Sequence, residues 1–291
     1  ASSPALLVHD AEFAESAVEL QRRCSNGELL AIGGGAADSQ YEQALARFDG
    51  EAVEPVALTH DDVITIMYTS GTTGLPKGAM ITHGMNFWNA VNLGIPGGIG
   101  IDTVHLNVLP LFHTGGLNCY CNPVLHAGGT VVLLKAFEPG ETLQVIGDEA
   151  QGITHFFAVP APYQFMMQHP DFADTDLSRL RIAGVGGAPC ALTIMETWME
   201  RGVSLAQGFG MTETSPACIF LDPGDALRKI GSTGKALLHT EYRVVDDDGG
   251  DCGPDQVGEL WVAGPHITPG YWNRPDATAD AFEGRWLKTG D

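Results

Sequence analysis

The residues best able to do chemistry are concentrated in one short segment, YTSGTTGLPKG, which spans residues 68–78. Glycines let a backbone take positive φ and bring its N–H groups close to an anion. The segment has three of them: Gly71, Gly74 and Gly78. Hydroxyl donors for phosphate oxygens come from four side chains: Thr69, Ser70, Thr72 and Thr73. Lys77 adds a positive charge, and a polar turn without function seldom combines all of these features, so the segment predicts a phosphate-binding loop.

The elements on either side of this loop must hold it in place. The apolar run Val63–Met67 predicts a strand before the loop, and Thr82 is placed to cap a helix after it. The loop of the P-loop nucleotide triphosphatases has the pattern G-x-x-x-x-G-K-[ST]. Here Gly71 and Gly74 are three residues apart and Lys77 is followed by glycine, so that pattern does not match. The segment predicts a phosphate-binding loop of another kind.

Apolar patterns predict the fold of the rest of the chain. Up to about residue 206, short apolar runs alternate with helical patterns, which is typical of βαβ units and a mostly parallel sheet. The strands expected there span 6–8, 29–32, 63–68, 106–109, 131–134, 155–159 and 181–185. The helices are expected near 83–93, 116–126, 140–150, 160–168 and 189–200. After about residue 216, strands at 241–245 and 257–262 flank a turn-rich segment that suits a hairpin.

The expected fold class is therefore α/β, with stacked βαβ subdomains, a mostly parallel sheet and a small antiparallel unit resembling a β-barrel. We expect three parts. Residues 1–95 are the remnant of a first α/β subdomain that carries the phosphate loop, residues 96–216 form a second α/β subdomain, and residues 217–291 form a β-rich subdomain.

Composition excludes several classes of function. The net charge of −21 repels phosphate backbones and anionic lipid head groups, so nucleic acid and membrane surfaces are not expected partners. No run of 18 apolar residues occurs, and the start, ASSPALLVHD, lacks the features of a signal peptide. The six cysteines include no C-x-x-C pair. We therefore expect a reduced, cytoplasmic protein without a cysteine metal site.

The segment YTSGTTGLPKG resembles the phosphate loop of the adenylate-forming, or AMP-binding, superfamily. That superfamily includes acyl- and aryl-CoA synthetases, peptide-synthetase adenylation domains and beetle luciferases. Four further stretches match its motifs in the same order: GGAP at 186–189, GFGMTET at 208–214, GELW through GYW at 258–272, and TGD at 289–291. Ordered matches from 68 to 291 argue against an accident. The chain is most similar to a bacterial acyl-CoA synthetase (a fatty-acid or aryl-acid CoA ligase), as a truncated large N-terminal domain.

The resemblance implies roles for single residues. Thr212 would bond the α-phosphate of ATP, Glu213 would hold Mg²⁺, and Asp291 would accept both ribose hydroxyls. Phe209 would offer its ring to adenine, although a core phenylalanine is the alternative. The whole nucleotide-binding set that the resemblance implies is Thr69, Ser70, Gly71, Thr72, Thr73, Gly74, Lys77, Gly187, Ala188, Pro189, Gly208, Phe209, Gly210, Met211, Thr212 and Asp291.

His113 is the third catalytic candidate beside Thr212 and Glu213. It matches a position that borders the path of the substrate carboxylate in the family, and a buried histidine with a purely structural role is the alternative. Residues 110–121 contain no acid, which argues against an amino-acid substrate. The pocket for the acid is expected in residues 96–216 and would draw on four apolar residues, for which plain core is the alternative: Phe156, Phe157, Tyr163 and Met166.

The chemistry implied is attack of a carboxylate on the α-phosphorus of ATP, followed by thioester formation with coenzyme A. ATP, Mg²⁺, coenzyme A and a fatty or aryl acid are the expected ligands, and a homodimer is left open. In the family a lysine on a separate C-terminal lid domain completes the site, and that domain is absent here. We therefore expect weak nucleotide binding and no normal rate of adenylation from this chain.

Three other functions remain open at this point. The chain could belong to an adenylation domain that loads a carrier protein, to a luciferase-like oxygenase, or to a nucleotide-binding module without catalysis. The thiol acceptor separates the first from a coenzyme A ligase.

Overall fold

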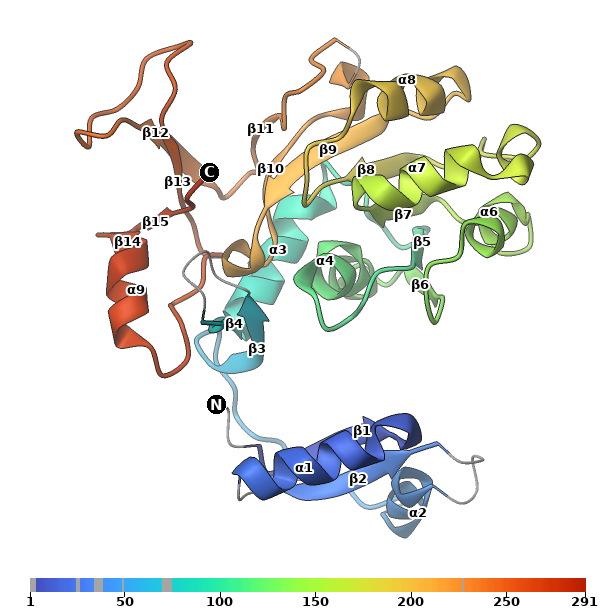
Figure 1. Cartoon of the computed structure of the whole chain (residues 1–291), viewed down its shortest axis with the longest axis vertical. Coiled ribbons are helices and arrows are strands. Elements are labelled where there is room, and N and C mark those ends of the chain that lie inside the picture. Colours follow the sequence, from blue (N-terminus) through green and yellow to red (C-terminus); the bar gives the residue numbers. More distant parts are fainter. Residues whose placement is uncertain (1–3, 25–26, 34–38, 49, 70–74, 227) are drawn as a thin grey trace. The chain divides into compact units, whose positions relative to one another are not determined.

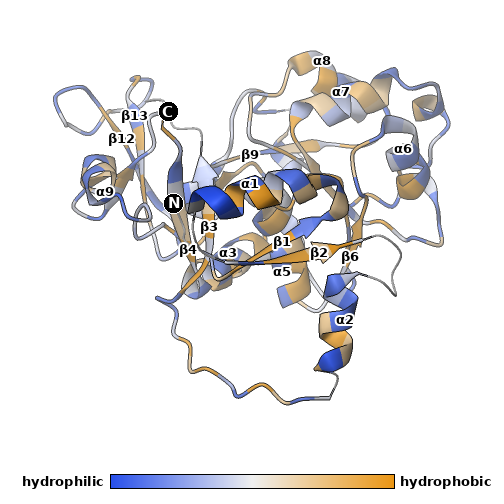
Figure 2. Ribbon diagram, turned by 60° about the horizontal axis from the view of Figure 1, so that its bottom comes forward, coloured by the Kyte–Doolittle hydropathy of each residue, from blue (hydrophilic) through white to orange (hydrophobic). Residues whose placement is uncertain are grey.

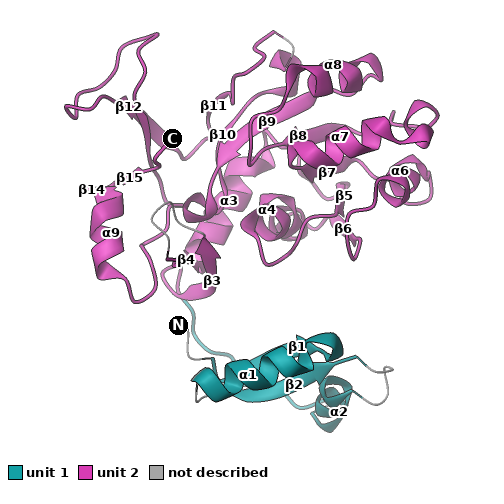
Figure 3. Ribbon diagram, viewed as in Figure 1, with its two compact units in different colours: residues 1–58 teal, residues 59–291 magenta. Residues whose placement is uncertain are grey.

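The computed structural model describes residues 4–24, 27–33, 39–48, 50–69, 75–226 and 228–291. The chain divides into two compact units, Ala1–Leu58 and Thr59–Asp291 (Figure 3). The expected division into three parts, at residues 95 and 216, remains a prediction.

The first unit is a small α/β layer. Strands β1 (Leu6–Asp10) and β2 (Glu28–Ile32) pair in parallel, and helices α1 (Ala14–Cys24) and α2 (Gln40–Arg47) accompany them. Figure 2 shows both strands coloured as mostly hydrophobic, whereas α1 alternates between hydrophilic and hydrophobic stretches. This alternation is typical of a helix with one face on a sheet.

The second unit is built on a seven-stranded sheet with the order β11-β10-β9-β8-β7-β5-β6 (Figure 1). The strands from β6 to β9 are parallel, and β10 and β11 are antiparallel additions at one edge. Their bounds are β5 Val104–Asn107, β6 Thr130–Leu133, β7 His155–Ala158, β8 Ile182–Val185, β9 Leu205–Gly210, β10 Ala217–Phe220 and β11 Lys235–Ala236. The mostly parallel sheet expected from the sequence is confirmed.

Helices cover both faces of this sheet. Residues of the helices α6 (Pro139–Gly147), α7 (Pro160–Gln168) and α8 (Leu192–Glu200) pack in one core cluster with Leu205 and Ala183. Ala206, which follows Leu205, belongs to a cluster with helix α3 (His83–Gly94). Ile182, which precedes Ala183, belongs to a cluster with the 117–126 segment. Because side chains alternate along a strand, this assignment separates the two faces.

The helix expected at 116–126 is three helical segments in succession. They are α4 (Thr114–Gly116), a π-helical turn at Leu117–Cys121 and α5 (Asn122–His126). Glycine at position 116 lets the start of this helical segment lie close to Pro110, because a Cβ there would be 2.3 Å from the Pro110 carbonyl oxygen.

The phosphate loop is not placed between a strand and a helix, as the sequence suggested. It joins the two antiparallel strands β3 (Val63–Thr69) and β4 (Lys77–Thr82), and only then does α3 (His83–Gly94) begin. The predicted cap is confirmed, because Thr82 Oγ1 accepts a hydrogen bond of 3.1 Å from Met85 N. Strand β4 was missed because its buried positions do not alternate.

The C-terminal part holds an open, four-stranded antiparallel sheet with the order β12-β13-β15-β14. Its elements are β12 Glu241–Val245, β13 Glu259–Ala263, α9 Pro275–Ala281, β14 Phe282–Glu283 and β15 Trp286–Lys288. The expected resemblance to a barrel is wrong, because the two edge strands do not pair with each other and the sheet does not close. Within the described part of the chain, no helix has the length and apolarity required to cross a membrane.

His266 makes the stability of this part sensitive to acid. Its side chain is buried, its Nε2 lies 3.3 Å from Thr240 Oγ1, and burial lowers its pKa from 6.5 to about 4. The unfolded chain therefore takes up this proton first as the pH falls. We expect the free energy of unfolding to drop by a few kcal/mol between pH 6.5 and about 4, measured by urea denaturation at each pH. His266→Gln should flatten this slope.

The control for that series is His126→Gln, which changes an exposed histidine. It should leave the slope as in the wild type. His105 is also buried, and burial lowers its pKa to about 3, so the His266 variant should keep part of the slope. An unchanged slope in the His266 variant would contradict the argument.

Candidate active site

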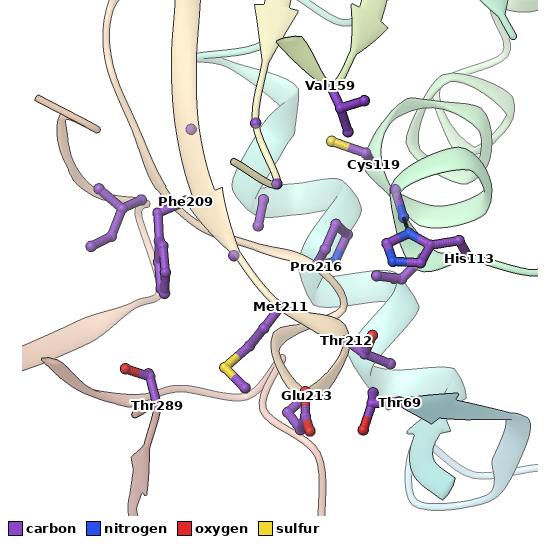
Figure 4. A pocket seen from close by; sticks show the side chains of 18 of the residues that line it. Thr69, His113, Cys119, Val159, Phe209, Met211, Thr212, Glu213, Pro216 and Thr289 are labelled. Atoms are coloured by element: carbon purple, nitrogen blue, oxygen red, sulfur yellow. Dashed lines mark hydrogen bonds between the residues drawn. The ribbon is translucent and has the colours of Figure 1, made fainter. Parts of the chain in front are cut away.

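One large cavity of about 1290 Å³ lies in the second unit. Its walls come from β3 and β4, the 109–120 segment, the ends of β7 to β9, β10 and the C-terminal sheet. Figure 4 shows Thr69, Thr212 and Glu213 together on one side of it, with Phe209 across from them and His113 on a separate wall. The predicted motifs, far apart in sequence, therefore meet around one space.

The two ends of the phosphate loop face this cavity. Thr69 closes β3 and Lys77 opens β4, and Thr69 Oγ1 donates a hydrogen bond of 3.4 Å to the Lys77 carbonyl oxygen. Gly78 follows, where a Cβ would lie 2.8 Å from Ile66 Cγ2. The other loop residues assigned to phosphate, Ser70, Gly71, Thr72, Thr73 and Gly74, lie outside the described residues. The described ends place one hydroxyl and one ammonium group at the cavity.

The GFGMTET segment brings its residues to the cavity through a tight turn. Gly208, Phe209 and Gly210 end strand β9 and line the cavity with Met211. A 3₁₀ turn follows at Thr212–Thr214, where Met211 N donates to Thr214 Oγ1 at 2.9 Å. Phe209 is partly buried and also packs against a core cluster, as the alternative expected, whereas a contact of its ring with adenine remains a prediction.

Glu213 is held at a defined position by Tyr271. Glu213 as a whole is 4 % exposed, and the Tyr271 hydroxyl donates to its Oε1 at 2.7 Å. Burial and the neighbouring Glu213 carboxylate raise the pKa of Tyr271, so the phenol stays a donor. The Lys77 ammonium lies 5.1 Å from the centre of the Tyr271 ring. Lys77, Tyr271 and Glu213 thus form a connected polar group.

Strand β4 carries this arrangement together with the segment 270–272. Met80 N donates to the Gly270 carbonyl oxygen at 3.1 Å, and Trp272 N donates to the Gly78 carbonyl oxygen at 2.8 Å. Thr268 Oγ1 donates to the Met80 carbonyl oxygen at 2.7 Å. Tyr271 belongs to the GYW motif at 270–272 but is not among the site residues that the sequence predicts. Only the fold shows that it contacts Glu213.

The Glu213 carboxylate suits Mg²⁺ that arrives with a nucleotide. Mg²⁺ is commonly bound by one or two carboxylates, waters and substrate phosphates rather than by a cage of protein ligands. Glu213 Oε1 accepts from Tyr271, and no hydrogen bond to Oε2 is found among the described residues. No group of three or more His, Cys, Asp or Glu side chains forms a metal cage in the described ranges. A single carboxylate connected to Lys77 through Tyr271 fits the binding of a metal that keeps waters and substrate phosphates as its other ligands.

The other predicted residues differ in where they lie. Gly187 lines the cavity with positive φ of 75°, whereas Ala188 and Pro189 are exposed and are not part of its lining. Thr289 and Gly290 line it, and Asp291 does not. The main chain of Asp291 is nevertheless fixed, because its carbonyl oxygen accepts from Leu260 N at 2.8 Å. The roles of these residues toward adenine and ribose remain predictions.

His113 lines the cavity with an exposed ring, so it is not buried as the alternative expected, and its catalytic role remains a prediction. Its Nδ1 accepts a hydrogen bond of 3.1 Å from Gly115 N and thereby caps α4. This bond fixes Nδ1 as the acceptor and leaves Nε2 to carry the proton when the ring is neutral. The ring can therefore donate to an anion through Nε2.

Part of the cavity lining is apolar. It includes Leu93, Cys119, Tyr120, Phe157, Val159 and Val185. Of the four residues expected to form an acid pocket, only Phe157 lines the cavity. Phe156, Tyr163 and Met166 are fully buried in the core under α6–α8, so that expectation is wrong for them. Successive residues of a strand face opposite sides, and this alternation could have separated Phe156 from Phe157.

These two phenylalanines should therefore respond differently to truncation. Phe156→Ala should cost about 3 to 5 kcal/mol of stability, because it leaves a hole in a packed core. Phe157→Ala should cost less, because this ring is only partly buried at the cavity. It should also enlarge the space for an acid, which thermal-shift assays with aryl acids of increasing bulk would detect. Equal losses of stability in urea denaturation would contradict the assignment.

Comparisons with known proteins agree with this geometry. The sequence profile of the family described as "AMP-binding enzyme" matches residues 1–272. The chain belongs to this family, and the resemblance inferred from its motifs is confirmed.

Particular relatives define the similarity more closely. The chain is 39 % identical over 291 residues to a feruloyl-CoA synthase of Amycolatopsis sp., covering all of this chain and 56 % of the relative. It is 39 % identical over 251 residues to an indoleacetate–CoA ligase of Aromatoleum aromaticum, covering 86 % of this chain and 49 % of that protein. The chain thus spans about half the length of these curated relatives.

A solved structure shows the same fold with nucleotide. The O-succinylbenzoate coenzyme A synthetase of Bacillus subtilis, in complex with ATP and a magnesium ion, matches with a TM-score of 0.81 and 30 % identity. The match covers all of this chain and 57 % of that one.

Proposed function

We propose that this chain is the nucleotide- and acid-binding part of a ligase that activates a carboxylic acid with ATP and then forms a thioester with coenzyme A. The observation that carries the proposal is the mixed lining of the cavity. Thr69, Thr212 and Glu213 lie together on one side of it (Figure 4), Lys77 also lines it, and the lining further includes apolar residues such as Phe157. A cavity with such a lining fits a substrate pair made of a nucleotide and an apolar acid.

The acid is an aromatic one in this proposal. Feruloyl-CoA synthase, indoleacetate–CoA ligase and 2-succinylbenzoate–CoA ligase, the names of relatives at 38 to 39 % identity, all describe aromatic acids. The cavity lining supports this choice, because it includes the aromatic rings of Tyr120 and Phe157, with centroids 5.9 Å apart and an interplanar angle of 29°. No acidic residue occurs in the 109–120 wall that would pair with the ammonium group of an amino acid.

The reaction begins with attack of the acid's carboxylate on the α-phosphorus of ATP, with pyrophosphate leaving and an acyl-adenylate forming. Both reactants are anionic, so donors and positive charge must lie where charge develops. Lys77 and the Thr69 hydroxyl would hold the leaving phosphates, Thr212 would bond the α-phosphate, and His113 Nε2 would face the carboxylate. Mg²⁺ bound at Glu213 would supply further neutralisation of phosphate charge.

The test uses the chain and a longer protein that contains it. Isothermal titration of the chain with ATP and Mg²⁺ should show binding. With the longer protein, aryl acids should stimulate exchange of pyrophosphate into ATP, and AMP release should require coenzyme A. Binding of neither ATP nor AMP would overturn the nucleotide assignment. Acid-dependent AMP release with a carrier protein, but not with coenzyme A, would show the alternative function of an adenylation domain.

A further inference from the structure

Glu259 is a carboxylate in the cavity lining whose two oxygens are both occupied by donors of the chain. It is half-buried at the start of β13. Its Oε1 accepts a hydrogen bond of 2.8 Å from Gly290 N, and its Oε2 accepts one of 2.8 Å from Trp261 Nε1. Hydrogen bonds to an ionised acceptor are stronger than those between neutral groups. The carboxylate therefore acts on the segment that contains Gly290.

The chain bends at Gly290, and Glu259 supports the bend. Gly290 has a φ of 79°, in the left-handed region that glycine adopts at little cost. On either side of it, Thr289 N donates to the Leu260 carbonyl oxygen at 3.2 Å, and the Asp291 carbonyl oxygen accepts from Leu260 N at 2.8 Å. The side chain of Glu259 and the main chain of Leu260 thus hold these three successive residues in one conformation.

Trp261 fixes the carboxylate through its second oxygen. The indole N–H donates to Oε2 of Glu259, and the Arg243 guanidinium lies 5.7 Å from the centre of the Trp261 ring. Two donors on two different oxygens define the rotation of the carboxylate, which one donor alone would not do. A glutamine has a single acceptor oxygen, so in this arrangement it could satisfy only one of the two N–H groups.

The segment that Glu259 holds lies near Phe209. Figure 4 shows Thr289 and Phe209 on one side of the cavity, and both line it. Leu260 packs against the same buried cluster as Phe209. Burial raises the pKa of the Cys218 thiol to about 12, and the Asp291 carboxylate adds to this rise. Because Cys218 Sγ lies 3.5 Å from the Phe209 carbonyl oxygen, the Asp291 side chain is close to the strands that carry Phe209.

This place suits the sugar of a nucleotide. The motif match assigns Phe209 to adenine and Asp291 to the ribose hydroxyls, and in a nucleotide the sugar is attached directly to the base. Hydrogen bonds weaken steeply when donor and acceptor are misaligned. The position of residue 291 therefore decides how well its carboxylate meets the two hydroxyl donors.

We propose that Glu259 is a positioning residue for nucleotide binding, which sets the place of Asp291 against the sugar hydroxyls by holding Gly290. This inference rests on the proposed function, and it adds a residue that acts on the nucleotide through a neighbouring segment. Loss of the bond between Glu259 and Gly290 should lower the affinity only for ligands that carry the sugar hydroxyls.

The first test compares AMP with an analogue that lacks both sugar hydroxyl groups, by titration calorimetry of the full chain. The wild type should bind AMP about 10- to 100-fold more tightly than the analogue. Glu259→Gln should lose most of this preference because AMP binds more weakly, whereas its affinity for the analogue should stay as in the wild type. Glu259→Asp should do the same, because its carboxylate is one methylene group too short to reach both donors. A general loss of structure would weaken both ligands alike.

The second test is a rescue. Trp261→Phe removes the indole donor, leaves the bond between Glu259 and Gly290 in place, and should keep the preference of the wild type. In the double variant that combines Glu259→Gln with Trp261→Phe, the amide oxygen is free to accept from Gly290 N, so the preference should return. The control is Glu241→Gln, which removes an exposed carboxylate paired with Arg285 on the same sheet and outside the cavity lining. It should bind both ligands as the wild type does.

The outcomes separate this inference from the proposed function. If the wild type binds AMP and the analogue equally, or if the Glu259 variants keep the full preference, the role of Glu259 is wrong and the ligase function stands. A double variant that does not recover the preference would overturn the role as well. Urea denaturation checks that each variant is folded, and Glu259→Asp carries the test if Glu259→Gln is not. If neither ligand binds the wild type, the nucleotide assignment fails and the inference falls with it.

Discussion

Glu213→Gln should remove the effect of Mg²⁺ on nucleotide binding and slow adenylation by about 10²- to 10³-fold. The substitution keeps the size of the side chain and its bond to Tyr271, at 2.7 Å in the wild type, but removes the charge that a divalent cation requires. Titration calorimetry with ATP, with and without Mg²⁺, measures the first effect in the chain itself. Pyrophosphate exchange measures the second in a longer protein that contains it.

Two further variants test whether the lost charge of Glu213 causes these two effects. Tyr271→Phe keeps the carboxylate but removes its hydrogen-bond donor, so it should weaken the Mg²⁺ effect only about 10-fold and leave binding of Mg²⁺-free ATP unchanged. Glu283→Gln removes an exposed carboxylate outside the cavity and should behave as the wild type. An undiminished Mg²⁺ effect in Glu213→Gln would refute the assignment of Glu213 as the metal ligand.

A large loss of stability, together with a loss of nucleotide binding, is expected from Gly210→Ala. A Cβ at this position would lie 1.9 Å from the Pro216 carbonyl oxygen, and the next contact, at 2.7 Å, is with backbone as well. A backbone atom cannot avoid the clash by a change of rotamer, as a side-chain atom can. The strands β9 and β10 would therefore have to separate where they pair. We expect a loss of about 3 kcal/mol or more in denaturant unfolding, with a parallel loss of ATP binding because the turn at 212–214 moves.

Gly94→Ala is the matched control for this substitution. Gly94 ends α3, and a Cβ there would meet nothing within 4 Å. Alanine favours a helix over glycine by up to about 1 kcal/mol, so this variant should be neutral or slightly more stable. An unfolding midpoint of Gly210→Ala that equals that of Gly94→Ala would show that the β9–β10 pairing tolerates a side chain.

The sequence predicted the elements whose patterns are clear. Helix α7 begins at Pro160 and ends at Gln168 as expected, because a proline opens it and an apolar face follows. Strand β12, Glu241–Val245, also has its expected bounds. The helix predicted to start at residue 189 begins only at Leu192, after the exposed Ala188 and Pro189. Local signals are strong enough for such elements but do not fix every boundary.

The candidate site was predictable only in part, for a physical reason. Motif matches identified Lys77, Thr212 and Glu213, which line one cavity. The bond between Tyr271 and Glu213 joins residues 58 apart, so no local pattern reveals it. The pocket for the acid was harder to predict, because an apolar residue has the same sequence pattern whether it faces a cavity or a core. Phe156 and Phe157 are neighbours that differ in this respect.

The pairing of β4 with the segment 270–272 has a mechanical consequence. Met80 N donates a hydrogen bond from β4 to the 270–272 segment, and Trp272 N donates one in the opposite direction. The Thr268 hydroxyl adds a third hydrogen bond, to the Met80 carbonyl oxygen. Lys77 is the first residue of β4, and Tyr271, whose hydroxyl group donates to Glu213, lies in the segment that pairs with β4. The backbones that carry Lys77 and Tyr271 are therefore joined, and moving them apart requires local unfolding of this pairing. In energetic terms, the spacing between these two stretches of backbone is as stable as the two backbone hydrogen bonds that join them.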